Sequence, residues 1–392
     1  MTGTQQMKIY YVVNARLPTE KAHGVQIAKM CEALIGQGID MELVVPSRRV
    51  GAAPEDLREF YDLNVAIPVR RLPVFDCYER GAIGFWIGSL SFMCSYAAFF
   101  LIRRLRSTSR ERVMVYTTDI DQFSFLLIPF LGLPYGVEMH DAKPWSLRFR
   151  LLLRRASGIV VINRIIRQEI AATFGINESA IAVHPNGIDV ARFSQTMGRA
   201  EARAARGIAS DVLIALYAGK CYPWKGLDAL VRAAGVSQGV HFYLVGGTRG
   251  ELAAATGAGA IPANITAVGH QPYRSMPEWL AAADVLLVTG TQGNEYSYKH
   301  TSPMKLFEYM AAGRAIIAAD TPAVRQVVSE REVVFYTSDD GRDLAEKIAY
   351  AFAHPEEAAA KAANAAALAR QFSWQSRADA IIRFMRQRID LL

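Results

Sequence analysis

The feature of this sequence that most limits its fold is an alternation of short β-rich runs with helical stretches, which occurs twice. In the first half the β-rich runs are 8–15, 41–47, 113–118, 135–140, 158–163 and 180–186, with an amphipathic helix predicted at 25–38. In the second half they are 213–220, 241–247, 264–269, 284–290, 315–320 and 333–337, separated by helical stretches such as 226–235, 276–283 and 303–312. This alternation is typical of parallel α/β sheets. We therefore predict two Rossmann-like domains that face each other across a cleft, with ligands at the carboxyl ends of the strands.

The boundary between the two halves is predicted from a break in the pattern. A chain of 392 residues is too long for one ordinary domain. Residues 192–211 lack a strand pattern and are typical of a connector with a short helix. We expect one domain at 1–194 and a second at 195–373.

Composition limits the class of protein and its compartment. Hydrophobic residues make up 51% of the chain and charged residues 21%, as in globular proteins. The four cysteines lie far apart without CxxC spacing, and the seven histidines show no HxxxH or HExxH pattern, so we expect no metal site. The first residues lack a signal-peptide pattern and lead into a strand. These observations favour a cytoplasmic protein.

The positive charge is concentrated in one part of the first half. Residues 103–167 contain twelve Lys or Arg and five Asp or Glu, an excess equal to the net charge of +7 for the whole chain. An ordinary solvated surface, an anionic lipid surface and a phosphate-bearing acceptor all agree with this excess. No known nucleic-acid-binding motif is present, so we expect no nucleic-acid partner.

Residues 84–102 form a stretch of nineteen residues without a charge, followed by Arg-Arg-Leu-Arg. That length is just sufficient to cross a bilayer. Against a transmembrane span, the stretch contains several Gly and Ser residues and would separate strands that must pair in one sheet. We expect a helix that is buried or in partial contact with a membrane; a true span and a helix docked on a protein partner are the alternatives.

The helix predicted after residue 302 has an unusual amino end. Ser302 suits the N-cap, Pro303 the first helical position, and Gly313 the position just past the end. Lys305 falls in the first turn, where a cation opposes the helix dipole at a cost of roughly 0.3–1 kcal/mol. An anion bound at this end would compensate, so we predict an anion site.

A second anion site is predicted in the loop of residues 218–226, after the first strand of the second half. Lys220 and Lys225 flank this loop, and a helix opens at Gly226, so two ammonium groups and a helix amino end can converge on one anion. Ordinary surface lysines on a turn are the alternative.

Three loops of the first half also lie at predicted strand ends. Glu138 and His140 alternate outward along one strand, and His140 reaches its end. Asn186 and the following glycine form a turn after another strand. Gly24 lies where a loop enters a helix, and a glycine there permits close backbone approach to a phosphate.

Together these motifs resemble the retaining GT-B glycosyltransferases of glycosyltransferase family 4. The resemblance is carried, in chain order, by HGVQIAKMCEAL, VEMHD, VHPNGID, AGKCYPWKG, SPMKLFEYMAAG and the C-terminal FSW. It implies the GT-B fold, a sugar-nucleotide donor bound mainly by the second domain and an acceptor bound mainly by the first. It also implies that the final helix, within 374–392, crosses back onto the first domain.

The resemblance assigns roles to several residues of the second half. Glu308 is similar to the glutamate that holds the donor ribose hydroxyls, and Lys225 to the lysine that binds the diphosphate. Lys220 stands where many members have arginine. The remaining donor contacts are implied for the helix start at Ser302, Pro303, Met304 and Lys305, through backbone amides.

Two further roles and one departure follow from the same comparison. In the first half, His140 resembles the histidine that contacts the transferred sugar, and Gly24 would approach the diphosphate. His140, Lys225 and Glu308 are the expected catalytic residues. Members of the family place another glutamate where this chain has His300, so we expect His300 in the donor site and a different contact to the sugar. Glu295 is a nearby substitute.

The function expected from the resemblance is transfer of a sugar, with retention, from a UDP- or GDP-linked donor to a lipid-linked or polysaccharide acceptor in cell-surface glycan synthesis. No metal and no cofactor are expected, because lysines and helix amino ends would stabilise the leaving diphosphate. We expect a cytoplasmic protein, peripheral on the inner face of the plasma membrane through its first domain. A UDP-sugar epimerase of the same fold and a non-catalytic two-domain binding protein are the alternatives.

Overall fold

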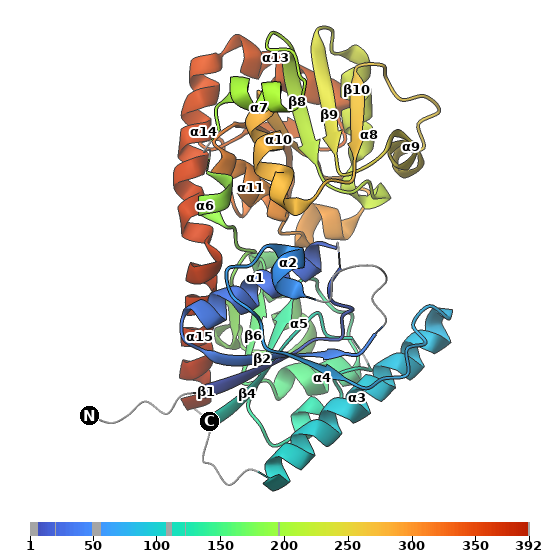
Figure 1. Ribbon diagram of the computed structural model, residues 1–392, viewed down its shortest axis with the longest axis vertical. Helices are drawn as coiled ribbons and strands as arrows, with labels where there is room; N and C mark the ends of the chain where they lie inside the picture. The colour runs from blue at the N-terminus through green and yellow to red at the C-terminus, as the bar shows by residue number, and fades with distance from the viewer. Residues whose placement is uncertain are drawn as a thin grey trace, which may run out of the picture. The chain divides into compact units, whose positions relative to one another are not determined.

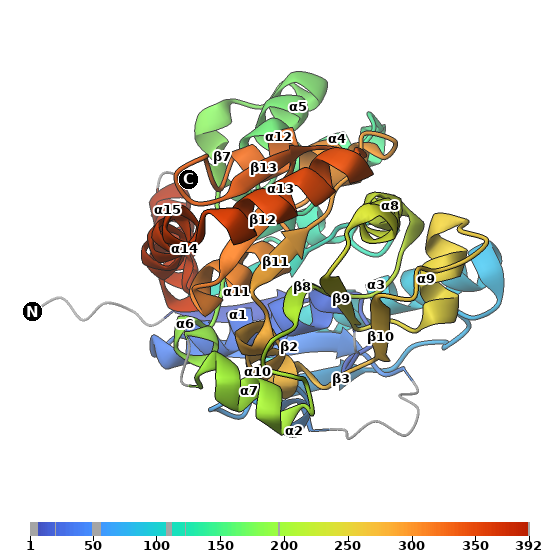
Figure 2. The ribbon, with the colours of Figure 1, turned by 90° about the horizontal axis from the view of Figure 1, so that it is seen from above.

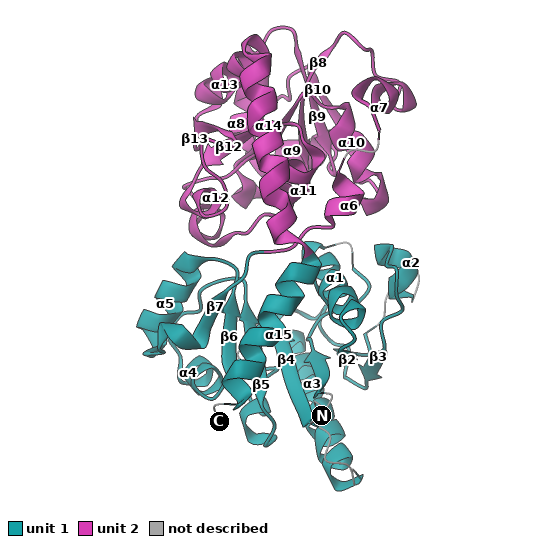
Figure 3. Cartoon of the chain, turned by 90° about the vertical axis from the view of Figure 1, so that its left-hand side faces the viewer, with its two compact units in different colours: residues 1–185, 374–392 teal, residues 186–373 magenta. Residues whose placement is uncertain are grey.

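The computed structural model describes residues 7–19, 21–48, 56–106, 112–121, 123–194 and 197–390. The chain divides into two compact units (Figure 3). Unit 1 consists of Met1–Pro185 and Trp374–Leu392, and unit 2 of Asn186–Ser373. Each unit is described by itself.

Unit 1 is built on a seven-stranded parallel sheet in the order β3-β2-β1-β4-β5-β6-β7 (Figure 1). Its strands are β1 (Met7–Val12), β2 (Asp40–Pro46), β3 (Val69–Leu72), β4 (Arg112–Thr118), β5 (Tyr135–Met139), β6 (Gly158–Val161) and β7 (Ile181–Val183). The central strand β1 pairs with β2 and β4, and all of its residues except Lys8 are buried. Such a run is expected for a parallel strand covered on both faces.

Most helices of unit 1 connect these strands, and one further helix comes from the C-terminal end of the chain. They are α1 (Ala22–Gly36), α2 (Leu57–Tyr61), α3 (Gly81–Arg106), α4 (Leu147–Arg154), α5 (Arg164–Phe174) and the C-terminal α15 (Trp374–Asp390), with short 3-10 turns at Ile128–Phe130 and Glu178–Ala180. The helix α15 packs on α1 and β6. It lies so close to the sheet that a Cβ atom on Gly136 would come within 2.6 Å of the Met385 side chain. The prediction that the final helix returns to the first domain is confirmed.

Unit 2 is built on a six-stranded parallel sheet in the order β10-β9-β8-β11-β12-β13. Its strands are β8 (Leu213–Ala218), β9 (Val240–Val245), β10 (Ile265–Gly269), β11 (Val285–Val288), β12 (Ala315–Asp320) and β13 (Val334–Thr337). Alternate residues of β8 enter two different hydrophobic cores: Ile214 and Leu216 enter one, Ala215 and Tyr217 the other. This follows from the two-residue period of a strand, and Figure 2 shows helices on both faces of the sheet.

The helices of unit 2 include α11, whose amino end is the predicted anion site. They are α6 (Val190–Phe193), α7 (Arg199–Ala205), α8 (Leu227–Val236), α9 (Arg249–Thr256), α10 (Met276–Ala282), α11 (Met304–Ala312), α12 (Pro322–Arg325), α13 (Gly341–Ala353) and α14 (Pro355–Ala369). Short turns lie at Pro223–Lys225 (η3), Tyr273–Ser275 (η4) and Arg370–Phe372 (η6), and a π-helical turn at Tyr296–His300 (η5).

The units divide at Pro185, earlier than the boundary expected at residue 194. The reason is hydrophobic: Ile188 and Phe193, which lie between the two positions, are buried in a core of unit 2. The strand β3 was missed because its central residues, Arg70 and Arg71, give it no apolar pattern. It lies at the sheet edge and pairs with β2 alone.

The uncharged stretch 84–102 lies within α3, which is much more exposed than a core helix. By length and composition, α3 is the one helix of the described ranges that could cross a membrane, yet only 28% of its most apolar window is buried. Figures 1 and 3 show α3 at the periphery of unit 1.

Candidate functional site

The amino end of α11 differs in one respect from the sequence prediction. The N-cap position is taken by Pro303, and no side chain caps the helix. The predicted cap, Ser302, is wrong because its hydroxyl instead accepts a hydrogen bond from the backbone N–H of Asn186, at 3.2 Å. Asn186 Nδ2 also donates to the Ser302 carbonyl, at 2.8 Å. The backbone N–H groups of Met304 and Lys305 are therefore left for another partner at this helix end.

The ammonium groups of Lys225 and Lys305 both lie beside Gly219, the residue that follows β8. Gly219 has a φ of +145°, and the position that its Cβ would take lies 3.5 Å from Lys225 Nζ and 3.4 Å from Lys305 Nζ. A side chain there would fill the space between the two ammonium groups. Lys225 Nζ also donates a hydrogen bond to the Lys220 carbonyl, at 3.1 Å. This bond closes the loop of residues 218–226 and holds the Lys225 side chain against it.

The electrostatics of this lysine cluster favour an anion. Burial lowers the pKa of Lys225 to about 8, and repulsion from Lys220 adds to the effect. Burial also lowers the pKa of Lys305 well below its ordinary value, together with repulsion from Lys225. Within the described ranges, no carboxylate lies at ion-pair distance from Lys225 or Lys305. Two half-buried ammonium groups with no carboxylate at ion-pair distance form a site for negative charge.

Lys305 and Glu308 both lie in the first half of α11; Glu308 is buried and Lys305 is half-buried. Lys305 Nζ lies 3.6 Å from the ring centroid of Tyr217. Glu308 is 8% exposed, and burial raises its pKa to about 7, against the lowering effects of a hydrogen bond with Tyr273 and the charge of Lys305. Tyr273 is thus a hydrogen-bond partner of the Glu308 carboxyl group.

His300 and Glu295 lie at the two ends of the π-helical turn before α11. His300 is the last residue of η5 and is buried. Glu295, the suggested substitute for the missing glutamate, is exposed and forms an ion pair with Lys299 at 3.1 Å. A π-helical turn is rare and frequently marks a functional site.

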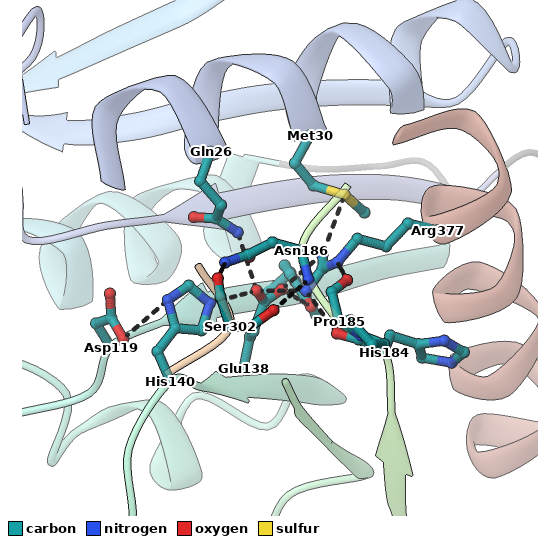
Figure 4. Close-up of polar contacts among 11 residues, drawn as sticks. Gln26, Met30, Asp119, Glu138, His140, His184, Pro185, Asn186, Ser302 and Arg377 are labelled. Carbon is teal, nitrogen blue, oxygen red and sulfur yellow. Dashed lines mark hydrogen bonds and ion pairs between the residues drawn. The ribbon is translucent and has the colours of Figure 1, made fainter. Parts of the chain in front are cut away.

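In unit 1 the strand β5 contains a buried glutamate, Glu138, which we had predicted to point outward. Glu138 was expected to point outward with His140, but it is fully buried, and Oε1 accepts from Arg377 at 2.7 Å and Gln26 at 2.9 Å (Figure 4). Oε2 accepts from the Tyr116 hydroxyl at 2.5 Å. Burial alone would raise the pKa of Glu138, but Arg377 and His140 hold it well below its usual range.

His140 lies between two carboxylates. Its Nε2 is 2.6 Å from Glu138 Oε1, and its Nδ1 is 3.5 Å from Asp119 Oδ1 (Figure 4). Burial would lower the pKa of His140, but Asp119 and Glu138 together raise it. Asp119 directly follows β4 with a φ of +50°, which turns its carboxylate toward the histidine. The two carboxylates thus favour the protonated form of the imidazole at the carboxyl edge of this sheet.

Gly24 is the third residue of α1, and the residues around it leave no room for a side chain. A Cβ atom there would come within 2.3 Å of the Tyr61 hydroxyl and 2.6 Å of Thr19 Cγ2. The Tyr61 hydroxyl is bound at both sides by the Thr19 backbone. Close packing by this loop therefore requires a glycine at position 24.

Several residues of these clusters were not predicted from the sequence, among them Tyr273, Asp119 and Arg377. No sequence pattern around Tyr273 or Asp119 indicates a role, because each contacts a partner that is distant in sequence. The pattern around Arg377 does indicate one, because this residue lies on the buried stripe of α15 with Trp374, Ala378 and Ile381. A charge on an apolar helix face implies a buried partner.

Two family models match the chain, and between them they cover most of its length. Residues 23–192 match Glycosyltransferase Family 4, and residues 227–383 match a glycosyl transferase-like family. Among curated proteins, the D-inositol 3-phosphate glycosyltransferase of Streptomyces scabiei is 29% identical over 222 residues, which is 52% of this chain and 47% of that protein. The enzyme of the same name from Actinosynnema mirum is 25% identical, over 59% of this chain and 57% of that protein. The chain spans about half the length of the curated relatives it matches.

Solved structures share the fold over almost the whole chain. HepE of Anabaena in complex with UDP has a TM-score of 0.72 at 17% identity, covering 97% of this chain and 100% of that one. Sucrose-phosphate synthase of Thermosynechococcus elongatus has a TM-score of 0.73 at 16% identity, covering 98% and 100%. Residues 23–192 therefore match glycosyltransferase family 4, residues 227–383 match a glycosyl transferase-like family, and the two parallel-sheet units have the fold of GT-B glycosyltransferase structures.

Proposed function

We propose that the chain is a retaining glycosyltransferase that moves a sugar from a UDP- or GDP-sugar to a lipid-linked or polysaccharide acceptor. The observation that carries the proposal is the convergence of the half-buried ammonium groups of Lys225 and Lys305 beside Gly219. A diphosphate supplies about two negative charges, which match this pair. HepE, which has the same fold, was crystallised with UDP and with UDP-glucose, which supports a nucleotide-sugar donor.

The chemistry follows from this charge distribution. As the bond between the anomeric carbon and the phosphate oxygen breaks, negative charge grows on the leaving diphosphate. Lys225, Lys305 and the free N–H groups at the start of α11 stabilise that charge, so a metal ion is not required. The acceptor oxygen bonds to the same face of the carbon, and its proton passes to a phosphate oxygen.

The other predicted residues complete the donor site. We assign the ribose hydroxyls to Glu308, because a carboxylate accepts two hydrogen bonds from a diol. We assign the transferred sugar to His140, and His300 to the region of the site where relatives have glutamate. Gly24 is assigned to the diphosphate as well.

The acceptor and the cellular location are proposed from unit 1. The basic excess of residues 103–167 and the exposed apolar surface of α3 support an amphiphilic, lipid-linked acceptor used in cell-surface glycan synthesis. We place the enzyme in the cytoplasm, peripheral on the inner face of the membrane.

The test of the donor chemistry is release of UDP or GDP from a panel of nucleotide sugars. We expect Lys225→Ala and Glu308→Ala each to lower the rate by about 10²-fold or more, with the circular dichroism spectrum unchanged. Lys347→Ala, which removes a half-buried lysine of α13 outside the site, is the matched control and should retain full activity. Wild-type rates in either site variant would contradict the assignment.

A further inference from the structure

The helix α3 has two apolar faces, and only one of them is covered. On the covered face, residues four apart enter unit 1: Gly84, Gly88, Phe92, Tyr96 and Phe100. On the opposite face lie Ile83, Ile87, Leu90, Leu101 and Leu105, which are 73, 45, 42, 59 and 77% exposed. No charged residue occurs from 82 to 102. A continuous exposed stripe of this kind marks an interaction surface.

The topology of unit 1 excludes a transmembrane orientation for α3. The strand before it, β3, and the strand after it, β4, belong to the same sheet. A helix that crossed a bilayer once would place these strands on opposite sides of the membrane. The covered face, moreover, contributes Phe92, Tyr96 and Phe100 to the core of unit 1. The helix can therefore meet a membrane only by lying along its surface.

The exposed surface continues from α3 to the segment that begins α4. The ring of Trp86 on α3 lies 5.1 Å from that of Phe123, and Arg148 Cζ lies 4.9 Å from the same Phe123 ring. Next to Arg148, Trp145 and Leu147 are 62% and 69% exposed. Exposed tryptophan, leucine and arginine together are typical of helices at the interface of a bilayer.

The charges beside this surface identify the partner. Arg104 and Arg106 end α3 and are exposed; on α4, Arg148, Arg150 and Arg154 are exposed and no acidic residue is present. Among the residues that the structure describes, none of the three α4 arginines forms an ion pair. Such a cluster attracts anionic lipid headgroups, at about 1 kcal/mol for each basic residue.

We propose that α3 and α4 dock unit 1 on an anionic phospholipid bilayer, with α3 flat in the interface and its Leu90–Leu101 stripe among the acyl chains. The inference deepens the proposed function by naming the surface at which a lipid-linked acceptor is met. Vesicle binding is measured without donor or acceptor, so its failure is separate from failure of the transferase proposal.

The test is flotation of the full chain with vesicles of phosphatidylcholine alone and of equal parts phosphatidylcholine and phosphatidylglycerol. We expect the wild type to float with the anionic vesicles and to be released by salt. Leu90→Gln/Leu101→Gln should bind about tenfold or more weakly, whereas Val236→Gln, which changes an exposed apolar residue of unit 2, should bind as the wild type does. Arg148→Gln/Arg150→Gln/Arg154→Gln should lose the preference for anionic vesicles.

Three results would overturn the proposal. The first is a wild type that does not float with anionic vesicles. The second is equal flotation of the wild type and both multiple variants. The third is a wild-type dimer in sedimentation that Leu90→Gln/Leu101→Gln converts to monomers while no form binds vesicles, which would assign the stripe to a second copy of the chain. If the leucine variant fails to fold by circular dichroism, the arginine variant still decides between these outcomes.

Discussion

Raising the pH from about 7 to about 9 should weaken binding of UDP, because it removes the proton of Lys225. Burial and the neighbouring Lys220 lower the pKa of Lys225 to about 8 in the free protein. A bound diphosphate favours the charged form and raises that pKa, so binding is coupled to proton uptake at alkaline pH. The diphosphate itself is already about nine-tenths ionised at pH 7 and changes little above it, since its last phosphate pKa is about 6.

The magnitude follows from the fraction of Lys225 that is charged before binding. With a pKa of about 8, roughly nine-tenths of the side chains are protonated at pH 7 and roughly one-tenth at pH 9. The dissociation constant for UDP should therefore rise about tenfold over this range from Lys225 alone, equivalent to about 1.4 kcal/mol. Lys305, whose pKa is also lowered, adds its own dependence in the same direction.

The assay is calorimetric titration with UDP across this pH range, on the wild type and on Lys225→Arg. Arginine keeps its charge at every pH in the range, so the variant removes the titration at position 225 while it retains that of Lys305 and the nucleotide. The ratio of the two dissociation constants should change about tenfold between the two pH values. A ratio that stays constant would refute the reasoning that Lys225 is a half-buried ammonium group in contact with the diphosphate.

Three other predictions concern stability and metal dependence. Arg377→Met should destabilise unit 1 by about 3–5 kcal/mol in urea unfolding, because it leaves the buried Glu138 carboxylate unpaired, and Arg377→Met/Glu138→Gln should recover part of the loss; equal losses in both would show that the charge is not the cause. Gly24→Ala should lower the free energy of unfolding by about 1–3 kcal/mol, because its methyl group would clash with the Tyr61 hydroxyl and Thr19, and an unchanged urea midpoint would contradict this packing. Transfer should persist in EDTA at the wild-type rate, since lysines balance the diphosphate charge; a loss restored by a divalent cation would contradict the metal-independent mechanism.

The fold was predicted well from local patterns, and the exceptions have physical causes. Apolar runs and helix periods follow from burial on both faces of a parallel sheet, and these patterns located every strand except β3. An edge strand with two central arginines has no such pattern. The exposed face of α3 could not be predicted either, because a segment without charges does not show which of its two apolar faces is covered.

The candidate site was partly predictable for a different reason. Lys220, Lys225 and Lys305 could be identified because each lies at a strand end or helix start, where the sequence shows the local geometry. Contacts between distant segments could not be identified. Glu138 and Arg377 are separated by 239 residues, and Tyr273 reaches Glu308 from another loop. Ser302 was assigned as an N-cap on local grounds, whereas Asn186 from the start of unit 2 uses its hydroxyl.

The most direct test of the proposed function is transfer of labelled sugar from UDP- and GDP-sugars to lipid. The enzyme is incubated with anionic membrane lipid extract, and the label is counted in the organic phase. We predict label in the organic phase for the wild type with at least one donor, and none above background for Glu308→Ala. The same label in Glu308→Ala as in the wild type, or label in neither organic-soluble lipid nor precipitable glycan with any donor, would contradict the account.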